Sequence, residues 1–263
     1  MENNTKRSSK KYILLCIVFG LSIVAMVGFA AALVLDLLTI GQGQSFYADQ
    51  SIEFRPRTQA SPSGSIQLTQ ANETEEPFVD FDEMREIFPS IVAWIQSEWT
   101  VINYPIVQGG DNDHYLYRLA DGRSHIMGSI FLDYRNVPDF SDQSIIIYGH
   151  DMRSGDMFGS LRHYTDQDYF EAHSSMFIFT PEQDFELLLF SGYVIDSAYE
   201  VPPMHFADQE DFDRFVSDIK RRSIFSSDVE VSFGDQIVFL ATCTPNNLEN
   251  ERLIIAGKLV AAP

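Results

Sequence analysis

The first forty residues contain one long apolar segment. Residues 12–35 form a run of 24 residues without a charged side chain. As an α-helix this run would extend about 36 Å, which exceeds the roughly 30 Å hydrocarbon core of a bilayer. The pattern therefore predicts a transmembrane helix, which we place at residues 12–38.

The flanking charges predict the orientation of this helix. By the positive-inside rule, residues 1–11 would be a cytoplasmic basic tail, and the chain beyond the helix would lie outside the cell. A cleaved signal peptide is the alternative, and the three alanines at 30–32 would suit cleavage. Because the apolar region of a signal peptide spans only about 7–15 residues, we expect an uncleaved signal anchor. The basic residues before the run are Lys6, Arg7, Lys10 and Lys11.

Beyond the anchor, the pattern predicts a linker and then a globular domain. Residues 39–77 are rich in Gln, Ser, Thr, Gly and Pro and lack sustained periodicity, which is typical of an extracytoplasmic linker. The globular domain would span residues 78–263. It begins with apolar residues at helical spacing over residues 81–88, after a candidate N-cap at Asp80. Residues 90–96 are predicted to form a second short helix.

Most of this domain has the pattern of short β-strands. Apolar runs separated by Gly, Asn, Asp and Pro predict a barrel or a sandwich. One later segment is helical instead, because apolar residues recur at helical spacing between Phe212 and Ile219, and we expect a helix near residues 208–222. The strand-like runs are VINYPIV, GSIFLDY, QSIIIYG, MFIFT, FELLLFSGYVI, QIVFLAT and RLIIAGKLV.

Composition and charge narrow the range of functions. The chain has 263 residues and is 45% hydrophobic, which suits a globular core beside the anchor. Its formal net charge of −20 argues against binding to nucleic acid, which requires a basic face. Asp111 and Asp113 could be calcium ligands, but a polar loop is the favoured explanation for them, and no metal or other cofactor is expected.

One cysteine is the strongest chemical signal in the exported part. Cys16 lies inside the predicted membrane helix, so Cys243 has no disulfide partner in the globular domain. A lone cysteine in an exported protein suggests an intermolecular disulfide or a reactive thiol. A reactive thiol needs ionisation, favoured by a nearby cation, and usually a histidine that exchanges its proton.

Two residues elsewhere in the chain suit these roles. His150 is the one histidine among six that directly follows a strand-like run and a glycine, and Arg252 opens the strand-like run after Cys243. Taken singly, each residue has an ordinary alternative: a packed thiol, a structural or surface histidine, and a surface arginine.

Together, these segments resemble the sortase family, and class B sortases most closely. The shared pattern is a strand that ends in Ala241-Thr242-Cys243, an arginine that opens the next strand, and an upstream histidine. The resemblance covers roughly residues 80–260. It implies a mainly β fold, a closed barrel of about eight strands with N-terminal helices and the inserted helix near 208–222. Its most specific stretches are VINYPIVQGGDNDHYL, GSIFLDYRN and YGHDMRSGDMFGSL.

The resemblance implies a membrane-anchored cysteine transpeptidase, an enzyme of the hydrolase and peptidase class. Cys243 would attack the C-terminal sorting signal of an exported surface protein and form a thioester acyl-enzyme. His150 would act as general acid and then as general base, and Arg252 would stabilise the oxyanion. The acceptor would be an amine of a cell-wall peptide or of a pilin subunit. The expected partners are therefore sorting-signal proteins, the acceptor peptide and the membrane, with no nucleic acid.

The resemblance also suggests residues that bind substrate. Asn112 and Leu116 match a segment of the class B substrate groove, although a turn residue and a core leucine are the alternatives. Ala241, Thr242 and Thr244 flank the nucleophile, and the backbone N–H of Thr244 would be a second oxyanion donor. Many class B members carry serine in place of Ala241 and an acidic residue in place of Thr244, so we expect the substrate preference to differ.

Residues near the histidine have less direct roles. Asp151 would either orient the imidazole or serve as a surface or turn residue, and the second role is expected. Asp133, Tyr148 and Ser160 are predicted to be structural.

Two other functions fit the same residues. One is a cysteine peptidase that uses water as acceptor. The other is a non-catalytic wall-associated binding domain in which Cys243 is incidental. A redox role is disfavoured because the sequence has no C-x-x-C motif.

Overall fold

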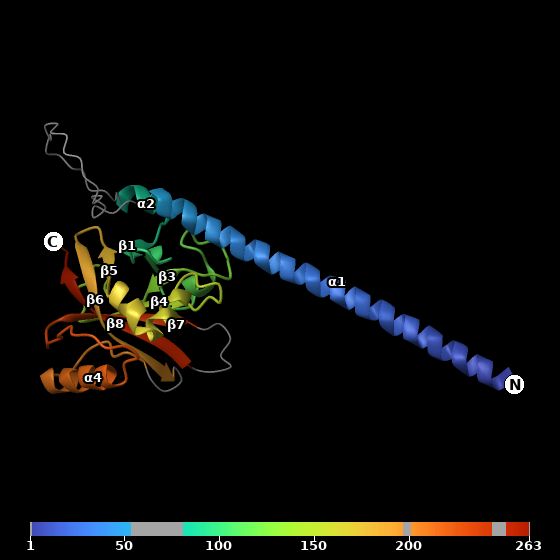
Figure 1. The fold of residues 1–263 in the computed structure, drawn as a ribbon. Coiled ribbons are helices and arrows are strands. Elements are labelled where there is room, and N and C mark those ends of the chain that lie inside the picture. The colour runs from blue at the N-terminus through green and yellow to red at the C-terminus, as the bar shows by residue number, and fades with distance from the viewer. Residues whose placement is uncertain (1, 54–80, 197–200, 244–250, 263) are drawn as a thin grey trace, which may run out of the picture. The chain divides into compact units, whose positions relative to one another are not determined.

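The computed structural model describes residues 2–53, 81–196, 201–243 and 251–262. The chain divides into two units, Met1–Ser45 and Phe46–Pro263. Helix α1 spans Glu2–Glu53 (Figure 1). Within its segment Ile17–Gln50, the most apolar stretch of 18 residues has a mean hydropathy of 2.6, and none of that stretch is buried. The helix is therefore long and apolar enough to span a membrane, as predicted, a property that signal sequences near an N-terminus share.

Helix α1 extends further than the sequence suggested. The expected linker began at residue 39, but the chain stays helical through Glu53, and from Phe46 onward it belongs to the second unit. Tyr47 is only 4% exposed and lies in the hydrophobic core of that unit. The adjacent aromatic side chains of Phe46 and Tyr47 supply the apolar surface that packs this segment against the core, although the rest of its composition is polar. Residues 54–77 of the expected linker lie outside the described residues.

The second unit is a closed barrel of eight strands, which confirms the predicted fold class. The strand order around the barrel is β1-β2-β3-β4-β7-β8-β6-β5, and Figure 1 shows the strands enclosing a common core. The strands are β1 (Ile91–Gln96), β2 (Asn103–Gln108), β3 (Ile130–Leu132), β4 (Ser144–His150), β5 (Ser175–Phe179), β6 (Asp184–Asp196), β7 (Gln236–Cys243) and β8 (Glu251–Ala261).

Strand β1 corrects one prediction. We expected a helix over residues 90–96, and this was wrong, because β1 pairs in antiparallel fashion with both β2 and β5. Ala93, Trp94 and Ile95 are fully buried. A short continuous apolar run has no period that separates a buried strand from a buried helix, and here pairing on both sides decides the outcome.

The helices agree with the remaining predictions. Helix α2 confirms the predicted first helix, although its candidate N-cap Asp80 lies outside the described residues. Helix α4 confirms the inserted helix, and the Asp208 carboxylate caps it by accepting the Asp211 N–H at 2.9 Å. The helices of the domain are α2 (Phe81–Ile87), α3 (Gln167–Ala172) and α4 (Gln209–Arg221), with the 3-10 helices η1 (His114–Tyr117) and η2 (Gly159–Thr165).

Helix α4 covers part of the outer surface of the barrel. The ring centroid of Phe215 on α4 lies 5.9 Å from that of Phe239 on β7, and the Ser191 hydroxyl of β6 donates to Ile219 O of α4 at 2.7 Å. Residues of β7 that share a face with Phe239 therefore lie on the outer face of the sheet, and their neighbours lie on the inner face. The sequence positions on β7 thus alternate between the outside and the inside of the barrel.

Candidate active site

Strands β4 and β7 bring two predicted catalytic residues together. They pair in parallel through seven residue pairs, from Ser144 with Ile237 to His150 with Cys243. Neighbouring strands lie about 4.8 Å apart, and register partners share a face of the sheet. The backbone positions of His150 and Cys243 are therefore adjacent, at the carboxyl ends of two buried strands.

The third predicted catalytic residue converges on the same place. Strand β8 pairs antiparallel with β7 up to Ala241 opposite Ile254. The ladder ends there, two residues short of Cys243 on β7 and of Arg252 on β8. The Thr242 hydroxyl holds the strands together between these positions, because it accepts the Leu253 N–H at 3.0 Å and lies 3.2 Å from Leu253 O.

The His150 imidazole is enclosed by the segment around η1. Its side chain is 1% exposed, its Nε2 lies 2.5 Å from Leu116 O, and its ring centroid lies 5.7 Å from that of Tyr117. A carbonyl oxygen only accepts hydrogen bonds, so Nε2 carries a proton in this arrangement. Leu116 was predicted to contact substrate. Its backbone carbonyl also forms a hydrogen bond with the His150 imidazole and so helps to position that ring.

A glycine that sequence reasoning did not single out touches this imidazole. Gly128 has a φ of +60°, and a Cβ there would lie 2.4 Å from Leu116 O and 2.9 Å from His150 Cδ2. Any other residue would therefore be strained in backbone and would collide with the histidine and its partner. Because Gly128 is far from Leu116 and His150 in the sequence, no local pattern indicates that these residues are close in space.

Asn112 is tied to a buried carboxylate. Its amide donates to Asp133 Oδ2 at 3.0 Å, and its oxygen accepts the Tyr134 N–H at 3.1 Å. Tyr148 on β4 also donates to Asp133 Oδ2, at 3.1 Å. Burial raises the pKa of Asp133, but hydrogen bonds from Arg135 and Asn112 outweigh it and leave the pKa below its usual value. This network fixes the segment before η1 and supports the structural role predicted for Asp133 and Tyr148.

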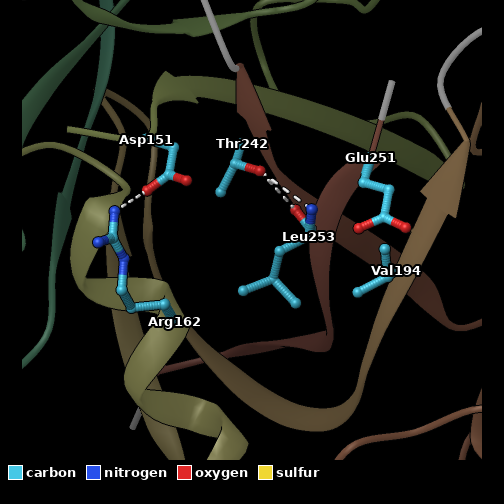
Figure 2. Close-up of a pocket in the computed structure, with 6 residues that line it drawn as sticks. All are labelled: Asp151, Arg162, Val194, Thr242, Glu251 and Leu253. Atoms are coloured by element: carbon cyan, nitrogen blue, oxygen red, sulfur yellow. Dashed lines mark hydrogen bonds and ion pairs between the residues drawn. The ribbon is translucent and has the colours of Figure 1, made fainter. Parts of the chain in front are cut away.

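Asp151 forms an ion pair with Arg162 of η2 rather than serving only as a turn residue. The same guanidinium donates to Met152 O at 3.1 Å. This pair borders a pocket of about 160 Å³, and Figure 2 shows Asp151 and Arg162 across it from Glu251. The pocket is lined by Asp151, Arg162, Val194, Thr242, Glu251 and Leu253.

This pocket adjoins the predicted catalytic residues His150 and Cys243, but neither residue lines it. Thr242 precedes Cys243 on β7 and lies on the inner face of the barrel, opposite to the face of Phe239, and Asp151 directly follows His150. The pocket therefore lies at the mouth of the barrel, one residue away in sequence from His150 and from Cys243, and its lining carries two carboxylates and one guanidinium.

The other predicted contacts are placed as follows. Ala241 and Thr242 are buried, at 1% and 3% exposure, and Thr244 lies outside the described residues. The Asp111 carboxylate accepts backbone N–H groups of Asp113 and His114, which lower its pKa. Within the described part of the chain, no group of three or more His, Cys, Asp or Glu side chains is arranged to hold a metal.

The closed eight-stranded barrel, with His150 and Cys243 paired at adjacent strand ends, is the arrangement expected of a sortase-type cysteine transpeptidase. The family model for the sortase domain matches residues 95–260, and the chain belongs to the sortase family.

Within this family the chain is similar to sortase B. It is 37% identical to sortase B of Listeria monocytogenes over 183 residues, which cover 68% of this chain and 74% of that protein. It is 29% identical to sortase B of Staphylococcus aureus over 196 residues, covering 74% and 80%. A solved Staphylococcus aureus sortase B–substrate complex has a TM-score of 0.75 and 26% identity, with 86% of this chain and all of that chain covered.

Proposed function

We propose that this protein attaches exported proteins to an amine at the cell surface through a thioester on Cys243. Family membership establishes a sortase transpeptidase of the cell wall, and the steps and residues are our proposal. The observation that carries it is the register pairing of His150 with Cys243, next to the position of Arg252. A nucleophile, a proton carrier and a cation are the three groups that acyl transfer through a thioester requires.

In the first half-reaction, the Cys243 thiolate attacks the backbone carbonyl carbon of the sorting signal. A C–S bond forms, the peptide C–N bond breaks, and the leaving amine takes a proton from His150. Arg252 and the backbone N–H of Thr244 stabilise the negative charge on the oxygen of the intermediate. Donors of this kind contribute roughly 10²–10³-fold to kcat.

In the second half-reaction, an acceptor amine attacks the thioester carbonyl. His150 removes a proton from this amine, a new amide bond forms, and the thiolate of Cys243 leaves. Water in place of the amine would give hydrolysis, the reaction of a plain peptidase of the same class.

We propose that the sorting signal lies along the outer face of the β4–β7 end. Asn112 and Leu116 would form one side of its binding site, and Ala241, Thr242 and Thr244 would shape the site beside the nucleophile. The Asn112 amide has a second N–H and a second lone pair beyond the bonds it makes to Asp133 and Tyr134. Substrate binding is therefore compatible with its place in the network.

We also propose that α1 is an uncleaved anchor with the N-terminus in the cytoplasm, so that the barrel acts at the outer face of the membrane. The composition of the helix and the basic residues before it support this orientation. Alkaline extraction of membranes, with protease treatment of intact cells, tests the proposal. Release of the full chain into the soluble fraction would contradict it.

The central experiment is a peptide-library screen with the full chain in detergent micelles. It combines library peptides with candidate amines, such as oligoglycine, and traps the acyl-enzyme for mass spectrometry. We expect a thioester on Cys243, an amide adduct when amine is present, and no processing by Cys243→Ala. His205→Gln, an exposed histidine, is the control for His150→Gln.

The outcomes separate the three functions. Cleavage that never yields an amine adduct would identify a peptidase. Full processing by Cys243→Ala would refute the nucleophile, and binding of wall material by a protein without a thioester would identify a binding domain.

A further inference from the structure

The end of helix α1 is part of the catalytic unit. Phe46 and Tyr47 belong to the same compact unit as the barrel. The Phe46 ring lies 6.0 Å from that of Phe88, and the guanidinium of Arg123 lies 5.1 Å from its centroid. The Tyr47 ring packs edge-on against that of Tyr104 on β2, at 5.3 Å. These contacts tether the residues that follow the apolar helix directly to the barrel.

The hydroxyl of Tyr47 reaches a specific peptide group. It donates to Gly128 O at 2.8 Å and lies 3.2 Å from the Ser129 hydroxyl. Ser129 in turn donates its hydroxyl to Arg118 O at 2.7 Å and its backbone N–H to Tyr115 O at 3.0 Å. Burial raises the pKa of Tyr47 well above its usual value, so the group stays a neutral donor at every working pH.

The Gly128 peptide is also the wall against which the His150 imidazole rests. The space that a Cβ on Gly128 would fill is bounded by His150 Cδ2 and by Leu116 O, the oxygen that pairs with His150 Nε2. A shift of this peptide would therefore change the space available to the imidazole and to Leu116 O. The Gly128 carbonyl is held from the other side by Tyr47.

We propose that Tyr47 is a positioning residue for His150, acting through the Gly128 peptide. The catalytic unit would then begin at Phe46, and the residues next to the membrane helix would contribute to turnover as well as to attachment. This proposal rests on the proposed role of His150 in proton transfer. A misplaced imidazole lowers the rate of proton transfer while leaving the sorting-signal site intact, so the loss falls on kcat.

The test is Tyr47→Phe in the full chain, in detergent micelles, with a sorting peptide and an amine at saturating concentration. The change removes only the hydroxyl and keeps the ring on Tyr104. We expect kcat to fall about tenfold or more, with KM for the sorting peptide unchanged within about twofold.

Tyr164→Phe is a matched control. Tyr164 is also buried, at 1% exposure, and donates to a backbone carbonyl, His173 O, at 2.9 Å, while its ring contacts Tyr169 and Phe225. Both variants lose one buried tyrosine–carbonyl bond, so we expect similar losses of thermal stability. Equal kcat values for the two variants, or a change confined to KM in Tyr47→Phe, would overturn the proposal.

A second variant approaches the same peptide from the opposite side. Gly128→Ala places a methyl group against His150 and Leu116 O, and we expect a larger fall in kcat than for Tyr47→Phe. A folded Gly128→Ala protein with normal kcat would also refute the proposal. Failure of the proposed function would be distinct, because His150→Gln would then keep its activity whatever the Tyr47 result.

Discussion

The hydroxyl of Thr242 bridges both backbone polar groups of Leu253. It accepts a hydrogen bond from the Leu253 N–H at 3.0 Å and donates one to Leu253 O at 3.2 Å. One side chain thus satisfies both the backbone donor and the backbone acceptor of a residue on the facing strand. Thr242 directly precedes the nucleophile and Leu253 directly follows Arg252. The bridge therefore sets the spacing between the proposed nucleophile and the cation proposed to stabilise the oxyanion.

This relationship predicts the effect of Thr242→Val. Valine keeps the shape but loses both hydrogen bonds, which we expect to cost about 1–3 kcal/mol of stability. If Thr242 acts mainly through the strand spacing, kcat falls and KM for the sorting peptide stays constant. Steady-state kinetics and urea unfolding measure the two effects.

The chain provides a matched control for that change. Thr180 makes the same double bridge to Gln183, donating to its carbonyl at 2.7 Å and accepting its N–H at 3.1 Å. Thr180→Val should lose similar stability and keep normal kcat. A rise in KM for the sorting peptide in Thr242→Val alone would favour direct substrate contact instead.

Arg252→Lys should be nearly as inactive as Arg252→Ala. The planar guanidinium presents several donors in fixed directions, which a lysine ammonium does not reproduce, although the charge is kept. We expect kcat to fall about 10²–10³-fold, the loss typical of an oxyanion donor. Arg222→Lys is the control, because Arg222 is also half-buried and donates to Val194 O at 2.8 Å. A lysine variant with near-normal kcat would exclude the oxyanion role.

Asp133→Asn should destabilise the domain in a pH-dependent way. The carboxylate is fully buried, accepts from Arg135 Nε and Nη2 at 2.8 Å each, and is further bonded by Asn112 and Tyr148. Its loss should cost about 1–3 kcal/mol at pH 7, the range for hydrogen bonds to a charged group. Because the pKa is lower in the folded state, this stabilisation is complete above the unfolded value near ~3.9 and is lost as the pH falls through the folded value.

Urea unfolding at pH 7 and near pH 3 measures this dependence. The difference between the parent protein and Asp133→Asn should shrink at the lower pH. Asp228→Asn, a change at an exposed carboxylate, should show no such dependence. An Asp133→Asn penalty that is constant with pH would mean that shape rather than charge is important at this position.

The sequence predicted those features of the fold that depend on local pattern. Seven apolar runs coincide with strands, and Phe212 and Ile219 form the buried face of α4 as their spacing indicated. Strand β1 was missed because its apolar run has no period of its own. The docking of Tyr47 was missed because the surrounding composition is polar and its hydrogen-bond partners Gly128 and Ser129 lie 81 and 82 residues away in the sequence.

The site was predictable where residue types carry chemistry in themselves. His150 and Cys243 were chosen from their positions at strand ends, and the parallel register places them side by side. Gly128 and the Asn112–Asp133 bond depend on contacts between distant loops, which neither spacing nor composition reveals. Sequence reasoning therefore proposed the reacting groups from residue type, position and family resemblance, and it did not identify the residues that pack around them.

The two carboxylates of the barrel-mouth pocket should favour a cationic acceptor. Asp151, Arg162 and Glu251 line this pocket beside His150 and Cys243, and Arg162 pairs with Asp151, so the lining has a formal net charge of −1. The resulting negative potential raises the local concentration of an ammonium-bearing peptide. In the variant Asp151→Asn with Glu251→Gln, we expect KM for the amine to rise about 3–10-fold. The rate of acylation by the sorting peptide should change less than about twofold, so the ratio of aminolysis to hydrolysis falls.

Added salt should reduce the difference in amine KM between the parent protein and this double variant, because salt screens charges beyond about 10 Å at 0.1 M. The control is Glu182→Gln with Asp228→Asn, two exposed carboxylates whose loss changes the net charge equally. If both double variants shift the amine KM equally, net charge rather than this pocket governs recruitment of the acceptor.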